Sequence, residues 1–415
     1  MLKGVLVILD GIGDLPNSQL KNKTPLDFAK TPNLDFFASR GKLGLMNPVK
    51  HGFVPESDEA VISIFGNDLI SSTRGQLEAI GAGFKLNRGD LALRVNFGTI
   101  DSIEKGNILD RRAGRTLTTL ESKQLAKALN KIKMPCKFEF KSTIQHRGAL
   151  VFRGGFSDNF TGNDLTYIQG KSKKITKIVS CKPNFEDENT NYTINIVNDF
   201  LRKAYEVLNE HPINKKRREK GLAPANYLFV RGPGIEKPKL KQYRRWFSVA
   251  YMPLERGISE VSGIKSFSFD YPKLKGIDAY ETLWKGLEKA CRNSIKLIKK
   301  NYKKFDYVYI HLKETDLPGH DNKPVIKKEM IEYIDKNLFG FLRKFAPSKK
   351  INILVTADHS TPCKLKNHSA DPVPVLFFDN SELEKKKFSE KQCKKGKLGL
   401  FNGKELLVKT GFTKK

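Results

Sequence analysis

Cysteine is scarce in this sequence, and its scarcity excludes a disulfide framework. The 415 residues include five cysteines, an odd number spread far apart, with no Cys-x-x-Cys pair. They are Cys136, Cys181, Cys291, Cys363 and Cys393. Such a pattern is typical of free thiols in a reducing compartment.

Long hydrophobic runs are missing as well. No stretch approaches the roughly 18 apolar residues that a membrane-spanning helix requires. The apolar run near the N-terminus is short and meets Asp10 at once, so it predicts a first strand and not a signal peptide. We expect a soluble, cytoplasmic protein.

Acidic residues are few beside basic ones, 45 against 75, which gives a formal net charge of +30. This excess favours anionic partners such as phosphate substrates, nucleic acid or acidic surfaces. Much of it lies in lysine-rich stretches such as Lys299–Lys304 and Lys394–Lys397, and no compact nucleic-acid motif accompanies it. We therefore expect no specific nucleic-acid binding.

Strands and helices alternate at the two ends of the chain. Residues 4–9 form a continuous apolar run, the mark of a strand buried on both faces. Later strands are predicted at Tyr307–Leu312, Ile351–Thr356 and Val373–Phe378, and helices at Tyr280–Asn301 and Lys327–Phe345. This order predicts an α/β fold, with a parallel-rich sheet flanked by helices.

The middle of the chain has a different character. Strand-like runs occur at Leu91–Asn96, Lys137–Phe140, Ala149–Phe152 and Lys177–Val179, and helices are fewer. One helix begins at Thr118, where Glu121 completes a capping box. We predict a discontinuous domain of residues 1–72 and 240–415, with a smaller α+β domain of residues 73–239 inserted in it.

Metal-ligand side chains follow the predicted strands. Asp10, Asp358 and His359 come just after strand ends, and Asp316 precedes His320 by four residues, with Pro318-Gly319 between them indicating a tight turn. In parallel sheets ligands gather at the carboxyl ends of strands. With His368, these side chains match the ligands of two divalent cations better than those of one. His311 lies inside a predicted strand and is interpreted as a core residue.

Ser57 is the best candidate nucleophile. It opens a short predicted helix, where the helix N-terminus adds partial positive charge, and a metal-bound serine loses its proton easily. Taken alone, a serine at this position is more often only a helix cap. Beside two metal sites we interpret it as the group that attacks phosphorus.

Arginines in the middle segment supply anion-binding groups. Asp110-Arg111-Arg112-Ala-Gly-Arg115 gathers three guanidinium groups beside a carboxylate, and Arg147 and Arg231 add two more. Arginine binds carboxylate and phosphate through a planar fork. An anionic substrate that also carries hydroxyl groups would need both guanidinium donors and a carboxylate acceptor.

In combination these motifs resemble a known family. Leu-Asp10-Gly-Ile-Gly-Asp, Ser57-Asp58, Asp110-Arg-Arg-Ala-Gly-Arg115, Asp316-x-x-Gly-His320, Asp358-His359-Ser-Thr-Pro and His368-Ser-x-Asp-Pro are similar to those of the archaeal-type cofactor-independent phosphoglycerate mutases. That family belongs to the alkaline phosphatase superfamily. The resemblance extends from Leu9 to about Pro374.

The resemblance implies an isomerase that converts 3-phosphoglycerate to 2-phosphoglycerate, in glycolysis and gluconeogenesis, through a phosphoserine at Ser57 and without bisphosphoglycerate. It implies one metal bound by Asp316, His320 and His368, and a second by Asp10, Ser57, Asp358 and His359. Manganese is the expected ion, with magnesium, cobalt or zinc as alternatives. It also implies that Asp110, Arg111, Arg147 and Arg231 bind the substrate.

The residues around Ser57 depart from the family pattern. Where the family usually has Gly-Ser-Asp-Thr-Ala-His, this chain has Glu56-Ser57-Asp58-Glu59-Ala60-Val61. The two added carboxylates change the electric field near the nucleophile. The alternative function is a metal-dependent phosphatase or another phosphomutase of the same superfamily, and the oligomeric state is not predicted.

Overall fold

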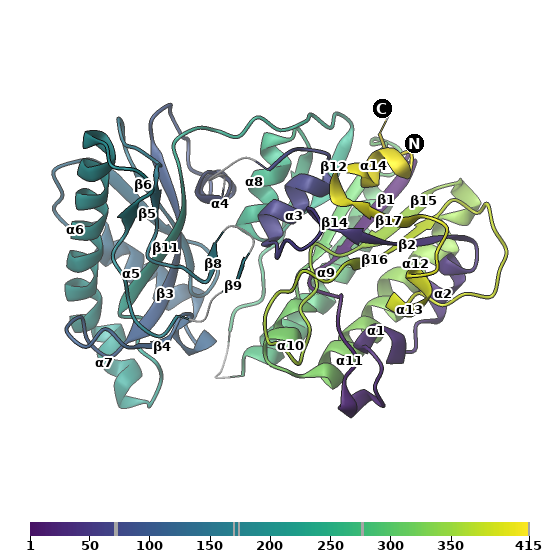
Figure 1. Cartoon of the computed structure of the whole chain (residues 1–415), viewed down its shortest axis with the longest axis horizontal. Helices are drawn as coiled ribbons and strands as arrows, with labels where there is room; N and C mark the ends of the chain where they lie inside the picture. The colour runs from purple at the N-terminus through teal and green to yellow at the C-terminus, as the bar shows by residue number, and fades with distance from the viewer. Residues whose placement is uncertain (70–73, 169–170, 173–174, 275–277, 414–415) are drawn as a thin grey trace.

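The computed structural model describes residues 1–69, 74–168, 171–172, 175–274 and 278–413, which form two main sheets, each with its own apolar core (Figure 1). The smaller sheet lies on the left of Figure 1 and the larger one on the right. The predicted domain boundary between residues 72 and 73 lies outside the described residues, and the one at residue 240 stays a prediction.

The larger sheet has eight strands, and β1 lies near its middle. Its first five strands run parallel, β16 is antiparallel to both of its neighbours, and β17 is parallel to β2. In spatial order the strands are β13 (Lys265–Phe267), β12 (Trp246–Val249), β14 (Tyr307–Leu312), β1 (Gly4–Leu9), β15 (Asn352–Thr356), β16 (Val373–Phe378), β2 (Gly41–Asn47) and β17 (Gly399–Asn402). Every residue of β1 is buried, as its unbroken apolar run predicts. The predicted α/β class with a parallel-rich sheet is confirmed.

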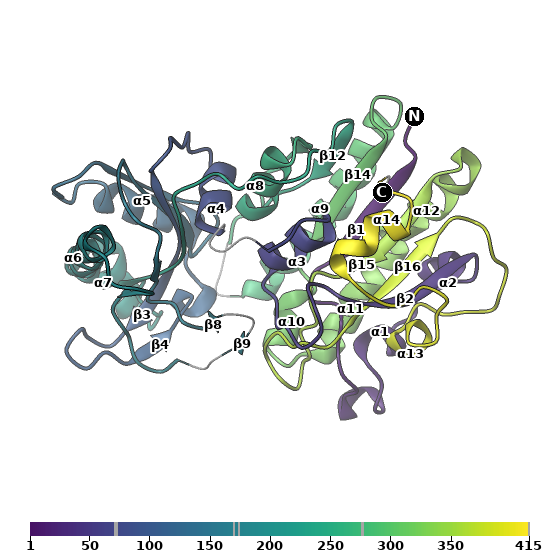
Figure 2. The same cartoon turned by 45° about the horizontal axis from the view of Figure 1, so that its top comes forward.

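Helices cover both faces of this sheet (Figure 2). They are α1 (Pro25–Phe28), α2 (Pro32–Ala38), α3 (Ser57–Ile64), α8 (Pro253–Val261), α9 (Ala279–Asn301), α10 (Asp316–His320), α11 (Pro324–Ile334), α12 (Gly340–Phe345), α13 (Glu390–Cys393) and α14 (Leu406–Lys409). A π-helical turn, Asp335–Phe339, joins α11 to α12, so the predicted helix Lys327–Phe345 is continuous but not regular. The tight turn predicted from Pro318-Gly319 is wrong, because this segment forms the short helix α10. Proline is tolerated there because the first turn of a helix needs no donor from it.

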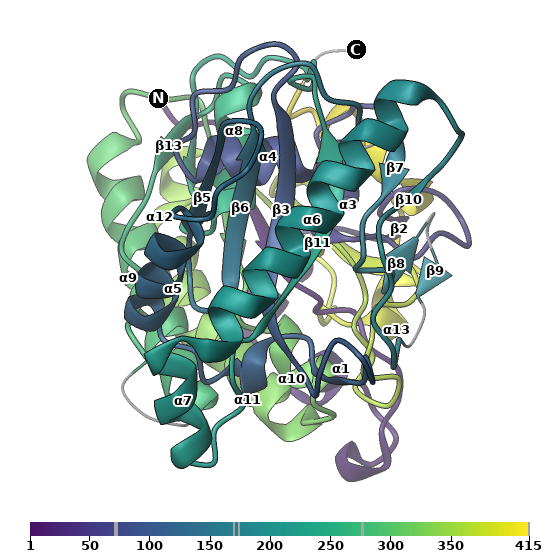
Figure 3. The same ribbon diagram turned by 90° about the vertical axis from the view of Figure 1, so that its left-hand side faces the viewer.

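The smaller sheet is antiparallel. Its strands are β11 (Tyr227–Gly234), β3 (Leu91–Ile100), β6 (Arg147–Phe152) and β5 (Phe138–Ser142), with β4 (Ile108–Asp110) paired to the end of β3. The associated helices are α4 (Arg74–Gly81), α5 (Thr119–Leu129), α6 (Glu188–Glu210) and α7 (Pro212–Glu219). Figure 3 shows α6 lying across the outer face of this sheet. The capping box of α5 is confirmed, because Thr118 Oγ1 accepts from the Glu121 amide at 3.1 Å and the Glu121 carboxylate accepts from the Thr118 amide at 2.8 Å. The strand predicted at Lys177–Val179 is reduced to one isolated bridge at Lys177.

Helices α4 and α8 join the two halves of the molecule and lie side by side in Figures 1 and 2. A Cβ atom on Gly81 would lie 1.7 Å from the carbonyl oxygen of Pro253, and one on Gly257 would lie 1.9 Å from that of Leu77. Only glycine fits at either position. The backbones therefore approach as closely as two helices can, which fixes α4 against α8 beside the functional site.

All five cysteines are free thiols. Four are buried, and Cys136 is half-buried beside β5. No described helix has both the length and the apolar character needed to cross a membrane.

Candidate active site

The candidate ligands lie at the carboxyl ends of three neighbouring parallel strands. Asp10 directly follows β1, Asp316 opens α10 after β14, and Asp358 and His359 follow β15. Because β1 pairs with β14 on one side and β15 on the other, these side chains meet at one edge of the sheet. The topology thus brings together residues from both ends of the chain.

Asp316, His320 and His368 form the first cluster, with one ligand atom of each within 4.8 Å of the others. Asp316 Oδ2 lies 3.3 Å from His320 Nε2, and Asp316 Oδ1 lies 3.9 Å from His368 Nε2. The second ring nitrogen of each histidine donates to a backbone carbonyl, His320 Nδ1 to Lys366 at 3.1 Å and His368 Nδ1 to Pro55 at 2.9 Å. Metal-ligating histidines are oriented in this way, with the other nitrogen left as the ligand.

Asp10, Ser57, Asp358 and His359 form the second cluster. His359 Nε2 lies 3.4 Å from Asp10 Oδ1, from Asp358 Oδ2 and from Ser57 Oγ. Ser57 is the first residue of α3, so its hydroxyl stands at a helix N-terminus, as predicted. The ring of His359 stacks on that of His368 at 3.6 Å, which sets the two clusters side by side.

The second cluster has the donor set of a divalent cation. Asp10 Oδ1 and Asp358 Oδ2 are buried and receive no hydrogen bond from the described residues. Burial and the neighbouring Asp358 carboxylate raise the pKa of Asp10. Burial lowers the pKa of His359, so that ring is neutral at pH 7. In the adjacent first cluster, burial and His359 lower the pKa of His368 to about 3. Neutral imidazoles and buried carboxylate oxygens that accept no hydrogen bond from the described residues fit a cation bound among them.

A single hydroxyl links the two clusters. Thr361 Oγ1 donates to Asp316 Oδ1 at 2.7 Å and lies 3.0 Å from His359 Nδ1. Because the hydroxyl proton goes to the carboxylate, His359 Nδ1 is the donor in the second bond. The remaining nitrogen of His359, Nε2, then carries the lone pair that faces Ser57.

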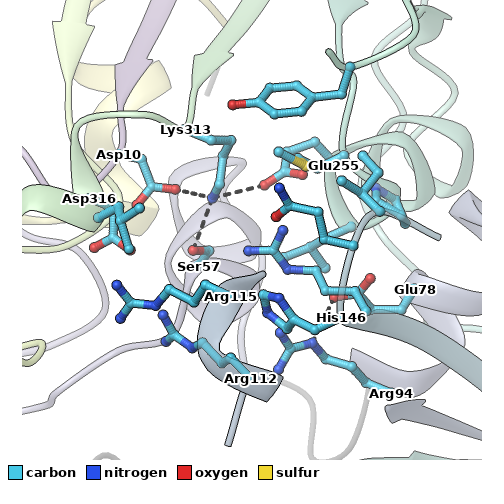
Figure 4. Close-up of a pocket in the computed structure, with 18 of the residues that line it drawn as sticks. Asp10, Ser57, Glu78, Arg94, Arg112, Arg115, His146, Glu255, Lys313 and Asp316 are labelled. Atoms are coloured by element: carbon cyan, nitrogen blue, oxygen red, sulfur yellow. Dashed lines mark hydrogen bonds and ion pairs between the residues drawn. The ribbon is translucent and has the colours of Figure 1, made fainter. Parts of the chain in front are cut away.

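Lys313 and Glu255 also enter the site, although neither is among the residues predicted from sequence. Lys313 directly follows β14, at the same end of the sheet as Asp10 and Asp358. Lys313 Nζ contacts Asp10 Oδ2, Ser57 Oγ at 3.2 Å and Glu255 Oε1 at 3.1 Å (Figure 4). Burial alone would lower the pKa of Lys313, but the carboxylates of Asp10 and Glu255 raise it, so the side chain is a fixed positive charge. His311, interpreted as a core residue, is indeed buried in β14, but its Nε2 lies 3.4 Å from Asp10 and from Asp358.

A network of buried arginines and carboxylates surrounds Glu56 and Asp58, the two chain neighbours of Ser57. Arg74 binds Glu56 at 2.5 Å and also contacts Asp58, while Arg231 contacts Glu56. Although burial opposes it, Arg231 and Arg74 lower the pKa of Glu56, which is therefore an anion at pH 7. Sequence inspection missed Arg74 because a lone arginine in a helix carries no pattern.

One cavity lies between the two sheets and is lined by many of these groups. The described residues that line it include the whole first cluster, Asp10 and Ser57 of the second, and Lys313 and Glu56. The smaller half of the molecule contributes arginines: Arg74, Arg94, Arg112, Arg115, Arg147 and Arg231. Figure 4 shows Arg112 and Arg115 extending toward Ser57 from the side opposite Lys313.

The predicted substrate-binding residues fall into two groups. Arg147 and Arg231 line the cavity. Asp110 and Arg111 are not among the described lining residues, because Asp110 Oδ1 accepts from the Arg112 amide at 2.6 Å and Arg111 pairs with Asp164. Within this motif it is Arg112 and Arg115 that face the cavity.

A contact between the two halves closes one side of the cavity. Arg115 binds Asp321 at 2.5 Å, and the Tyr280 hydroxyl donates to the same carboxylate at 2.7 Å. Asp321 directly follows His320, so the smaller half of the molecule is attached next to the first cluster.

Comparison with known proteins gives a consistent result. A family model described as 2,3-bisphosphoglycerate-independent phosphoglycerate mutase matches residues 38–214. The chain is 39% identical to a protein of that name from Thermococcus kodakarensis, over 98% of this chain and 95% of that protein. It is 35% identical to another, from Methanocaldococcus jannaschii, over 98% and 95% of the two chains.

Two solved structures are similar over the whole chain. The PH0037 protein from Pyrococcus horikoshii has a TM-score of 0.77 at 28% sequence identity, covering 100% of this chain and 99% of that one. The cofactor-independent phosphoglycerate mutase from Thermoplasma acidophilum has a TM-score of 0.56 at 28% identity, covering 98% of each chain.

Proposed function

The chain belongs to the 2,3-bisphosphoglycerate-independent phosphoglycerate mutase family, and on that premise we propose that its cavity interconverts 3-phosphoglycerate and 2-phosphoglycerate through a phosphoserine at Ser57. The observation that carries the proposal is the position of Ser57 Oγ, at a helix N-terminus and 3.4 Å from His359, in one of two adjacent groups of candidate metal ligands.

In the first half of the reaction, Ser57 Oγ forms a bond to phosphorus as the bond between phosphorus and the C3 oxygen of the substrate breaks. The freed glycerate takes up a proton and stays in the cavity. In the second half its C2 hydroxyl attacks the phosphoserine, and Ser57 regains its hydroxyl. No bisphosphoglycerate takes part.

Lys313 prepares Ser57 for this attack. Its ammonium group donates to Ser57 Oγ at 3.2 Å and is held there by Asp10 and Glu255. A positive charge beside the oxygen stabilises the negative charge that develops on it. Lys313 therefore favours both attack by Ser57 and its release in the second half-reaction.

Two divalent cations complete the site in this proposal. Asp316, His320 and His368 would hold one, and Asp10, Ser57, Asp358 and His359 the other. When bound, such ions neutralise charge on the oxygens of a transferring phosphoryl group. Mixed carboxylate and imidazole ligands favour manganese, with magnesium, cobalt or zinc as alternatives.

The arginines bind the anionic substrate and the glycerate released from it. The cavity is lined by four arginines that are placed to do so: Arg112, Arg115, Arg147 and Arg231. Asp110 and Arg111 lie outside the lining and would reach the substrate only after their side chains move. The Arg115–Asp321 contact helps to keep water from the phosphoserine by closing the cavity. Exclusion of water distinguishes a mutase from a phosphatase, because water would otherwise hydrolyse the phosphoserine.

The test is to incubate purified, metal-loaded protein with 3-phosphoglycerate and to follow the products by phosphorus NMR. We expect a 2-phosphoglycerate signal that is independent of added bisphosphoglycerate, and coupling to enolase gives its rate. Free phosphate without 2-phosphoglycerate would refute the proposal in favour of a phosphatase. Metal analysis of protein purified without chelators should find two ions per chain.

A further inference from the structure

Glu56 lines the cavity, but the proposed reaction gives it no task. It directly precedes Ser57 and is 7% exposed. Its carboxylate binds Arg74 at 2.5 Å and contacts Arg231, and both arginines line the cavity together with Ser57. An internal carboxylate thus occupies guanidinium groups that face the place where phosphate must bind.

The charges around Glu56 balance without any ligand. Four guanidinium groups, those of Arg74, Arg94, Arg111 and Arg231, pair with four carboxylates, those of Glu56, Asp58, Glu78 and Asp164. An entering anion therefore finds no net positive charge in this set. The anion can form an ion pair with these guanidinium groups only if one of the four carboxylates moves away from them.

Glu56 is the carboxylate best placed to move. It precedes α3 in extended backbone conformation, with φ −88° and ψ 165°, and its side chain forms one half of a capping box with Glu59. Its displacement therefore gives up that half of the cap but leaves the helix backbone in place. The other half of the box remains when the Glu56 side chain moves, because the Glu59 carboxylate accepts from the Glu56 amide at 2.8 Å. If Glu56 moves, Arg74 keeps Asp58 and Glu78, and Arg231 keeps Asp164.

We propose that Glu56 is an internal competitor for the phosphoryl-binding arginines, and that the phosphoryl group of the substrate displaces its carboxylate from Arg74 and Arg231. The chemistry of Ser57 points the same way. A phosphoryl group on Ser57 adds nearly two negative charges beside Glu56, and like charges repel at that range. Glu56 therefore weakens substrate binding and keeps the phosphoserine from accumulating.

The proposal rests on the proposed function for the identity of the substrate, but its anion-binding part can be tested alone. Glu56→Gln keeps the shape of the side chain and removes its charge. We expect the KM for 3-phosphoglycerate and the inhibition constant of inorganic phosphate to fall about tenfold, the scale of one charge-assisted hydrogen bond. The kcat should change less than KM.

Glu59→Gln is the matched control. It removes a carboxyl from the same helical turn but retains an acceptor for the Glu56 amide, and among the described residues Glu59 forms no ion pair. We expect its KM and its phosphate affinity to match those of the unmodified protein. Glu56→Gly, compatible with a helix N-cap, provides a second variant if the glutamine variant does not fold.

Titration calorimetry of the metal-loaded proteins with inorganic phosphate decides the question separately from turnover. Phosphate binding that is unchanged or weaker in both Glu56 variants would overturn the inference, because Glu56 would then organise the arginines and not compete for them. Failure of the unmodified protein to convert 3-phosphoglycerate would count against the proposed function alone. Even in that case, the competitor role would be supported if the Glu56 variants bound phosphate more tightly than the unmodified protein.

Discussion

Replacing Thr361 by valine tests whether one hydroxyl positions both candidate metal sites. Thr361 is fully buried, and its Oγ1 bonds to His359 Nδ1 at 3.0 Å and to Asp316 Oδ1 at 2.7 Å. His359 belongs to one cluster and Asp316 to the other. Valine has nearly the same shape, so the variant removes these two hydrogen bonds and little else.

The expected loss of metal affinity follows from the role of groups that hydrogen-bond to metal ligands and orient them. Without Thr361 Oγ1, the His359 ring is free to turn and the Asp316 carboxylate loses a donor. Loss of a group that orients a metal ligand typically lowers metal affinity about 10- to 100-fold, which corresponds to about 1.4 to 2.7 kcal/mol. We expect both ions to bind more weakly, because the hydroxyl contacts a ligand of each.

Competition with a fluorescent chelator measures manganese affinity for the unmodified protein, Thr361→Val and Thr361→Ser. Serine keeps the hydroxyl and loses only a methyl group, so its affinity should stay close to that of the unmodified protein. Equal affinities for the valine variant and the unmodified protein would refute the positioning role. An equal loss in the serine and valine variants would refute it too, because packing and not hydrogen bonding would then be the cause.

Three further predictions follow from named contacts. Ser57→Ala should abolish mutase turnover in the enolase-coupled assay while metal content, read by elemental analysis, stays near two ions; activity like that of the unmodified protein would remove Ser57 from the mechanism. Lys327 Nζ is fully buried and binds Asp14 at 2.7 Å, so Lys327→Met should lower the free energy of unfolding in urea by about 3–5 kcal/mol. The double variant with Asp14→Asn should recover part of that loss, and an unchanged urea midpoint in the single variant would contradict the argument. Burial raises the pKa of Glu390 to about 7 from its usual 4.5, so the protonated form stabilises the fold below about pH 4.5 and this stabilisation is lost as pH rises through 7. The unfolding free energy of the unmodified protein relative to Glu390→Gln should therefore fall on the order of 3 kcal/mol over that range, and a pH-independent difference would contradict it.

The sequence predicted the sheet edge that carries the candidate ligands because apolar runs and polar residues alternate sharply there. The run at β1 ends at Asp10, and the run at β15 ends just before Asp358. Parallel strands then require these carboxylates to meet. The same patterns did not reveal β2, because glycine and lysine interrupt its apolar residues, or β12, which is only 4 residues long.

Charged residues that function inside helices and strands could not be recognised. Glu255 lies inside α8 and carries no spacing signal. Lys313 directly follows β14, at the end of the sheet where the other candidate ligands lie, but its contact with Glu255 depends on tertiary packing. His311 was interpreted from its place in a strand, which said nothing of the direction of its ring. In the Asp110–Arg115 motif, Gly114 has φ +66°, and sequence alone could not tell which arginines this turn directs into the cavity.

The burial of the cysteines has a practical consequence for watching the molecule at work. Because four thiols are covered and Cys136 alone is partly accessible, a maleimide dye should label the native chain mainly at that position. Leu383, which is 79% exposed and follows β16 of the larger sheet, offers a place for a second, engineered thiol. A donor and acceptor on these two sites would report by energy transfer whether the halves change separation during turnover, without first stripping the chain of its natural sulfhydryls.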